Sequence, residues 1–163
     1  MENKMTTKEK RIFESLNLFS IYGYDGVSMR EIAAAVGIKG ASLYSHFKGK
    51  EDIFNGIFSE MIKQYDNAIV MMNIPIEENE QTIMAYHNAD ESRLLQMAEG
   101  VFDFFTQNEF TVMFRKLLIT EQHKSFIAAK HFKEYIWSHL FCFKAKYLGV
   151  YKKTGIFKTM MQR

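Results

Sequence analysis

The chain has 163 residues, of which 47% are hydrophobic and 25% charged, and its formal net charge is +2. A chain of this length and balance forms a globular fold with a sizeable core, and its single cysteine excludes an internal disulfide. One proline and nine glycines, among many Leu, Met, Lys and Glu residues, favour helices over strands. We therefore predict an all-α fold.

The charge is unevenly distributed along the chain. Residues 1–50 carry a net charge of +3, residues 51–114 one of −10, and residues 115–163 one of +9. The longest runs without a charged residue, 15–24 and 67–76, are about half the length of a membrane span. The N-terminus lacks the apolar block of a signal peptide. Together with the single cysteine, these features predict a cytoplasmic protein without a membrane span.

The first predicted helix covers residues 7–22. Its apolar residues recur at i, i+4 and i+7 and share one face: Ile12, Leu16 and Phe19. Gly23 lies where a glycine would end the helix. The stretch 24–27 then forms a short connection.

Two short helices are predicted next. A capping-box pattern begins at Ser28 and predicts a helix over 29–36, which a glycine interrupts. Leu43 and Phe47 are four residues apart and anchor the following helix. Two short helices joined by a glycine-bearing turn, the second with an exposed polar face, form a helix-turn-helix, which we place at 28–47.

The rest of the chain also has helical periodicity. A longer helix is predicted over 50–74, and the polar stretch 76–80 is predicted to be a linker at a domain boundary. Further helices are predicted over 90–107, 110–120 and 125–148. No internal repeat or low-complexity segment interrupts this pattern.

The start of the third predicted helix has the side chains that a helix in the DNA major groove requires. The groove is about 12 Å wide and admits a helix only when the intervening side chains are small. Gly40, Ala41 and Ser42 meet that requirement at the end that enters the groove. Lys39 can reach a base edge or a phosphate, and Ser42 can hydrogen-bond to either.

Four further side chains are candidates for phosphate contacts. Tyr44 and His46 flank the predicted buried positions and therefore face outward, where a hydroxyl and an imidazole can donate to phosphate oxygens. Lys50 and Ser28 stand at the starts of two helices, whose free N–H groups and positive dipole ends favour phosphate. We expect these anchors to converge on one duplex.

Residues 7–60 resemble the DNA-binding domain of the TetR family of bacterial transcriptional regulators. The resemblance rests on the order FxxxGYDGVSMREIAAAVGIKGASLYSHFKGKEDIF, from Phe19 to Phe54. It implies a three-helix DNA-binding head joined by a fourth helix to a helical ligand-binding and dimerisation domain. It also implies a homodimer on a palindromic operator, released by a small-molecule effector.

The resemblance implies roles for eight residues. Lys39, Gly40, Ala41 and Ser42 would face bases, and Ser28, Tyr44, His46 and Lys50 would hold phosphates. The implied domains are a helix-turn-helix domain at 1–50, a connecting helix at 51–74 and an effector-binding and dimerisation domain at 75–163. We expect a repressor whose partner is double-stranded DNA.

The predicted second domain has two candidate surfaces. One stripe of the helix at 125–148 is core, dimer seam or both: Phe132, Ile136, Leu140, Phe143 and Tyr147. An aromatic and Met-rich set either lines an effector pocket or forms core: Met97, Phe102, Phe104, Phe105, Phe110, Met113 and Phe114. The pattern assigns no individual residue to the effector.

Other functions find less support in the sequence. Paired carboxylates with a supporting His, a nucleophile motif and a phosphate-binding glycine loop are absent, so no enzyme activity and no cofactor are expected. His139 and Cys142 form an H-x-x-C pair, but a zinc site requires three or four converging ligands. The alternative is a basic amphipathic protein that acts on membranes or partner helices through 125–163.

Overall fold

The computed structural model describes residues 5–75, 77, 79–121, 123 and 124, and within them the chain forms helices and loops without a strand. The first four helices are α1 (Thr7–Tyr22), α2 (Met29–Val36), α3 (Gly40–Tyr44) and α4 (Lys50–Met71). They are followed by α5 (Glu80–Asn88), α6 (Glu91–Gln107) and α7 (Glu109–Glu121). The all-α prediction is confirmed.

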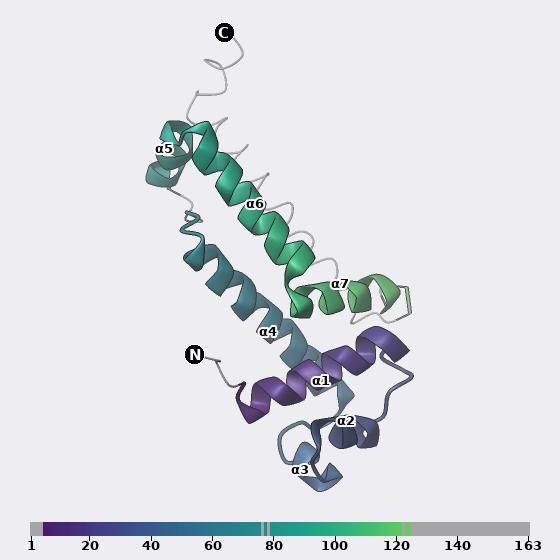
Figure 1. Ribbon diagram of the computed structural model, residues 1–163. Coiled ribbons are helices and arrows are strands. Elements are labelled where there is room, and N and C mark those ends of the chain that lie inside the picture. The colour runs from purple at the N-terminus through teal and green to yellow at the C-terminus, as the bar shows by residue number, and fades with distance from the viewer. Residues whose placement is uncertain (1–4, 76, 78, 122, 125–163) are drawn as a thin grey trace.

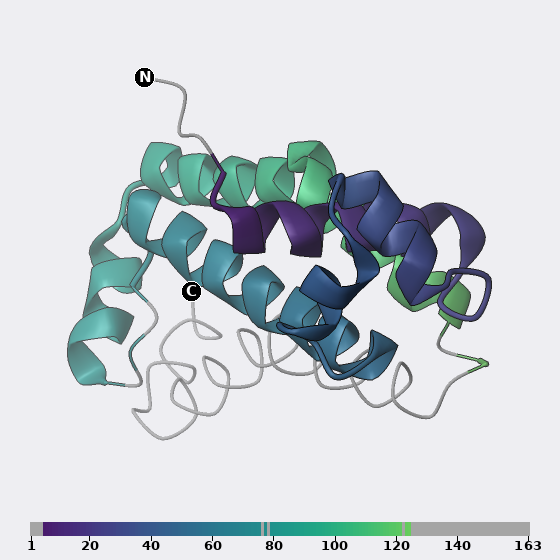
Figure 2. The same cartoon turned by 90° about the horizontal axis from the view of Figure 1, so that it is seen from below.

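The helices form an elongated arrangement with α2 and α3 at one end (Figure 1). We call α1–α3 the head and α5–α7 the body, and α4 connects them. From the head, α4 runs toward α5 at the far end, and α6 returns alongside α4 (Figures 1 and 2). The chain then turns, and α7 packs across α1. The head therefore contacts the body directly as well as through α4.

Sequence periodicity predicted α1 and α2 correctly, with the same bounds as in the structure. In α1 the predicted stripe of Ile12, Leu16 and Phe19 is buried. The Thr6 hydroxyl accepts from the Glu9 N–H, and the Glu9 carboxylate accepts from the Thr6 N–H, which completes a capping box. The capping residues, the terminal glycines and the apolar stripes were thus sufficient to predict the bounds of these two helices.

One hydrophobic core runs through the head and into the body. It joins the buried faces of α1 and α2 with Leu43 of α3, Ile57 of α4 and Leu117 of α7. The ring of Phe58 on α4 lies 5.7 Å, centroid to centroid, from that of Phe114 on α7. Because α7 supplies part of this core, the buried face of α1 packs against both the head helices and the body.

The connecting helix α4 ends at Met71, three residues before the predicted end at position 74. Asn73 has a φ of 52°, and the Ile74 N–H donates to the Ile69 carbonyl oxygen. This is a Schellman-type end, in which a left-handed residue directs the chain back over the last turn. Arg93 of α6 donates to the carbonyl oxygens of Met72 and Asn73, each at 2.9 Å.

The prediction for the connection after α4 was incomplete, because residues 80–88 form α5. Asn79 caps this helix by accepting from the Thr82 N–H at 2.8 Å. Only Thr82 and Ile83 of α5 are buried, so its apolar stripe is too short to stand out in the sequence. The predictions for 90–107 and 110–120 are confirmed within one residue at each end by α6 and α7.

Two further features concern the described residues only. None of their helices combines the length and the apolar character that a membrane crossing requires. They contain no group of three or more His, Cys, Asp or Glu side chains placed to hold a metal ion. The predicted helix at 125–148 and the H-x-x-C pair lie outside the described residues.

Candidate nucleic-acid interface

Local hydrogen bonds fix the angle between α2 and α3. The Ser28 hydroxyl accepts from the Glu31 N–H at 3.3 Å and caps the start of α2. At the other end Gly37 has a φ of 78°, and the Ile38 N–H donates to the Ala33 carbonyl oxygen at 2.9 Å. Glycine adopts this left-handed conformation without steric cost, so the chain turns sharply into α3.

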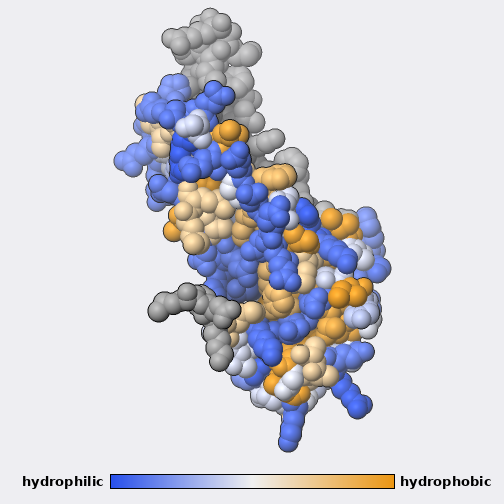
Figure 3. Space-filling model, viewed as in Figure 1, coloured by the Kyte–Doolittle hydropathy of each residue, from blue (hydrophilic) through white to orange (hydrophobic). Residues whose placement is uncertain are grey.

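The inner and outer faces of α3 differ as the sequence predicted. Leu43 is fully buried, and Phe47 is buried although it lies beyond the end of the helix. Of the predicted contact residues, Ser42 and Lys50 are half-buried, and the others are exposed: Ser28, Lys39, Gly40, Ala41, Tyr44 and His46. Hydrophilic side chains project from this end of the molecule (Figure 3). The structure thus brings the predicted base-facing residues onto one exposed surface.

Neither the packing nor the backbone conformation of the described residues requires a glycine at position 40. A Cβ at this position would meet nothing within 4 Å, and its φ lies outside the left-handed region. It stands at the first position of α3, where larger residues form helix at least as well. The packing of the head therefore does not require the absence of a side chain at this position.

The segment after α3 is a tight turn that leads into α4. The Ser45 hydroxyl donates to the Ser42 carbonyl oxygen at 2.8 Å, and the His46 N–H donates to the Leu43 carbonyl oxygen at 3.0 Å. Asp52 of α4 accepts from the Lys48 N–H at 3.0 Å. The imidazole of His46 therefore sits on a turn and not on the helix itself, and it is exposed.

Lys50 is held at the start of α4 by Tyr24, which lies in the turn between α1 and α2. The Lys50 Nζ donates to the Tyr24 carbonyl oxygen at 2.8 Å and lies 4.7 Å from the centroid of the Tyr24 ring. This ring packs at 5.4 Å against Phe19 and at 5.5 Å against Phe54. An ammonium has three protons, so Lys50 can also donate to a ligand.

Ser28 occupies a more constrained position than the sequence indicated. Both its N–H and its hydroxyl donate to Oε2 of Glu31 at 2.7 Å. These hydrogen bonds, chiefly that of the hydroxyl, lower the pKa of Glu31 below its ordinary value of 4.5. A hydroxyl has one proton, so a phosphate would have to replace the Glu31 carboxylate to receive it.

Three residues of this surface were not singled out from the sequence. Arg30, the second residue of α2, and Lys48, in the turn before α4, are both exposed cations near the ends of the helix-turn-helix. Tyr24 holds Lys50, and its own pKa is raised by burial and then by the nearby acidic charges of Glu51 and Asp25. Its aromatic type within the Gly-Tyr-Asp-Gly turn was the available signal.

The candidate residues of the second domain fall into two groups. The dimer stripe of Phe132, Ile136, Leu140, Phe143 and Tyr147 lies outside the described residues. Of the aromatic and Met-rich set, three rings are buried in the core and one is exposed: Phe104, Phe110 and Phe114 against Phe102. Three members of this set therefore belong to the hydrophobic core.

Comparison with known proteins identifies the head. The family model for bacterial regulatory proteins of the tetR family matches residues 14–57. The biofilm operon icaADBC HTH-type negative transcriptional regulator IcaR of Staphylococcus aureus strain Newman is 44% identical over 69 residues, which cover 40% of this chain and 35% of that protein. IcaR of Staphylococcus epidermidis is 47% identical over 47 residues, which cover 29% of this chain and 25% of that protein.

The chain therefore matches about a quarter to a third of the length of these curated relatives. Among solved structures, the fatty acid degradation regulator FadR from Bacillus halodurans aligns with a TM-score of 0.58 and 19% sequence identity, covering 94% of this chain and 72% of that one. This similarity concerns the fold alone. The match to the tetR family of bacterial regulatory proteins concerns residues 14–57, which contain most of α1, all of α2 and α3, and the start of α4.

Proposed function

We propose that this protein is a transcriptional regulator that binds double-stranded DNA as a homodimer, represses transcription, and leaves its operator when a small-molecule effector binds. The observation that carries the proposal is the outer face of α3, which is exposed, polar and open at Gly40. The family match of the head and the negative regulation named for IcaR support it. Such a regulator acts in the cytoplasm and catalyses no reaction.

In this proposal α3 reads the major groove with its N-terminal end. Gly40 and Ala41 allow the backbone to approach the base edges, and Lys39 and Ser42 donate to them. A good bidentate contact to a base is worth about 1–3 kcal/mol of discrimination. Sequence selectivity would thus depend mainly on the first turn of α3.

The phosphates would be held on either side of α3. Tyr44 and His46 donate from one flank, and Lys50 donates from the start of α4 with the protons that Tyr24 leaves free. Ser28 would join them only where its hydroxyl turns away from Glu31. Phosphate contacts set position and salt dependence rather than sequence preference.

The dimer and the effector response belong to the rest of the chain. We propose that residues 1–50 act as the DNA-binding domain, 51–74 as the connection and 75–163 as the effector-binding and dimerisation domain. Two heads related by two-fold symmetry would read the halves of a palindrome. An effector releases DNA only if it binds more tightly to the arrangement of heads that fits the operator poorly.

Selection of bound sequences from a random pool of duplex DNA tests this proposal. An enriched palindrome, bound by two chains, is the expected result. Failure to enrich any sequence would refute sequence-specific binding, and enrichment of a single half-site bound by one chain would refute the dimer.

Variants of α3 then test the assigned contacts. We expect Lys39→Ala to cost about 1–3 kcal/mol of affinity and to relax the preference at one base position. Tyr44→Phe should weaken binding to all sequences and lower the salt slope, and Gly40→Leu should abolish binding while the fold persists. Lys116→Ala, on an exposed position of α7, is the matched control. Unchanged affinity and salt slope in all three head variants would refute these contacts.

A further inference from the structure

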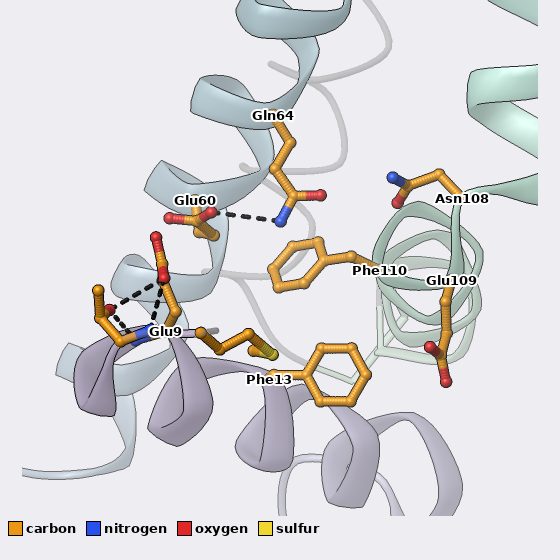
Figure 4. A pocket seen from close by; sticks show the side chains of 9 residues that line it. Glu9, Phe13, Glu60, Gln64, Asn108, Glu109 and Phe110 are labelled. Atoms are coloured by element: carbon orange, nitrogen blue, oxygen red, sulfur yellow. Dashed lines mark hydrogen bonds between the residues drawn. The ribbon is translucent and has the colours of Figure 1, made fainter. Parts of the chain in front are cut away.

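A cavity of about 460 Å³ lies where the head, α4 and the body meet (Figure 4). Its walls come from the N-terminal end of α1, the middle of α4 and the junction between α6 and α7. The residues that line it include Glu9 and Phe13 from the head, Glu60 and Gln64 from α4, and Phe110 from the body. The volume lies within the roughly 300–1,000 Å³ of small-molecule sites.

The side chains that line the cavity include three carboxylates and, in the described part of the chain, no basic group: Glu9, Glu60 and Glu109. Lys63 lies beside them, 3.1 Å from Glu9 and 3.5 Å from Glu60. The Thr6 backbone and Lys63 lower the pKa of Glu9 to about 2, so Glu9 is charged at neutral pH. Glu109 is exposed and has no hydrogen bond or ion pair with a described residue. The Lys63 ammonium thus pairs with two of the three carboxylates, Glu9 and Glu60.

Aromatic rings separate the two acidic ends of the cavity. Figure 4 shows Glu9 and Glu60 at one end and Glu109 at the other, with the rings of Phe13 and Phe110 between them. These rings offer apolar contact, and their faces attract a cation that has lost part of its hydration. A ligand that contacts both rings can also place a positive charge near a carboxylate.

This combination selects one class of ligand. An anion would be repelled by the carboxylates. An inorganic cation would leave the rings unused, and the described residues hold no cluster placed for a metal ion. A neutral apolar molecule would leave Glu109 without a counter-ion among the described residues. An organic cation with an aromatic or apolar body uses both parts of the wall.

We propose that this cavity binds a hydrophobic organic monocation, with its charge near Glu60 or Glu109 and its apolar body against Phe13 and Phe110. For its regulatory consequence the inference rests on the function proposed above. Because the walls belong to both head and body, a ligand in the cavity favours one arrangement of the two. Such a cation would then act as an effector of DNA binding.

Calorimetric titration of the full chain without DNA tests the site. The probes are tetraphenylphosphonium and tetraphenylborate, which have the same shape and opposite charge. We expect one phosphonium to bind per chain, and the borate to bind at least about tenfold more weakly, a difference of about 1.4 kcal/mol. Equal affinity for the two ions, or no binding of the phosphonium, would overturn the proposal.

Variants locate the binding at this cavity. The double variant Glu60→Gln with Glu109→Gln should lower phosphonium affinity about tenfold or more while the fold persists. Phe13→Ala should weaken binding through lost ring contact. Glu91→Gln, at the distant start of α6, removes one carboxylate elsewhere and should have no effect. Unchanged affinity in the double variant would place the bound ion elsewhere and overturn the assignment.

A second titration separates this inference from the proposed function. Phosphonium is added to the chain bound to its selected duplex, and we expect the dissociation constant for DNA to rise. If the chain binds no DNA, the regulator proposal fails while the DNA-free titration still decides the cavity. If DNA binds and phosphonium does not, the regulator stands and the cavity proposal falls. If phosphonium binds without changing DNA affinity, the site stands and its effector role falls.

Discussion

At the scale of single residues, two glycines of the head differ in whether packing within the chain requires them. A Cβ at Gly26 would collide with the Tyr22 carbonyl oxygen, whereas a Cβ at Gly40 would meet nothing within 4 Å. We expect Gly26→Ala to lower the free energy of unfolding by about 1–3 kcal/mol. Gly40→Ala should leave it unchanged or raise it, because Ala is the better helix former. Urea denaturation measures both, and equal losses would show that contacts within the chain require Gly40.

A second residue-scale prediction concerns Glu9, whose pKa is lowered from 4.5 to about 2 by hydrogen bonds from Thr6 and the ion pair with Lys63. A lowered folded-state pKa stabilises the fold above the unfolded-state value, and this contribution is lost as the pH falls from 4.5 toward 2. Glu9→Gln should therefore lower the urea midpoint at pH 7, by less at pH 3.5. Glu14→Gln on the same helix controls for the loss of one charge. A difference independent of pH would contradict the assignment.

At the scale of elements, sequence signals were sufficient where caps and apolar stripes coincide. Both ends of α2 were predictable because Ser28 and Gly37 supply a capping box and a left-handed end. The end of α4 was not, because it depends on a left-handed Asn73 and on Arg93 reaching back from α6. Such long-range contacts leave no local pattern, and α5, with two buried residues, leaves little periodicity.

The candidate interface shows the same limit. The small residues of α3 and the exposure of Tyr44 and His46 follow from spacing around Leu43 and Phe47, and they could be predicted. The hydrogen bond from Lys50 to the Tyr24 carbonyl oxygen could not be predicted, because it joins a turn and a helix whose residues are 26 positions apart. Sequence periodicity reports which face is buried, whereas tertiary contacts decide where a long side chain points.

This contact gives an element-scale prediction for the joint between the α1–α2 turn and α4. Lys50→Met should lower DNA affinity and reduce the salt slope by about 1, because one phosphate contact is lost. Tyr24→Phe should have no effect, since the ring and the backbone carbonyl both remain. Tyr24→Leu removes the ring under the ammonium and should give an intermediate loss. Affinity measured over a salt series checks this order, and wild-type behaviour of Lys50→Met would exclude the phosphate contact.

At the scale of the whole molecule, the polar stretch after α4 suggested a domain boundary, whereas the core runs across the head and body without a break. Buried residues of α1, α2, α3 and α4 belong to the same cluster as Phe110, Phe114, Leu117 and Leu118 of α7. Local composition marks a linker well, but it carries no information on whether the segments on either side pack together. Within the described residues, the head therefore has a face that α7 of the body covers.

The last prediction follows from this shared core. Leu117 of α7 is fully buried, and truncating it to Ala should cost about 2–5 kcal/mol through lost burial and the cavity left behind. Because Leu117 shares a core with α1, amide hydrogen exchange should accelerate in the head as well, for example at Leu16. Ile83→Ala in α5 is the control, since Ile83 is buried outside that cluster and its loss should leave head amides protected. Wild-type protection of Leu16 in Leu117→Ala would mean that head and body unfold independently.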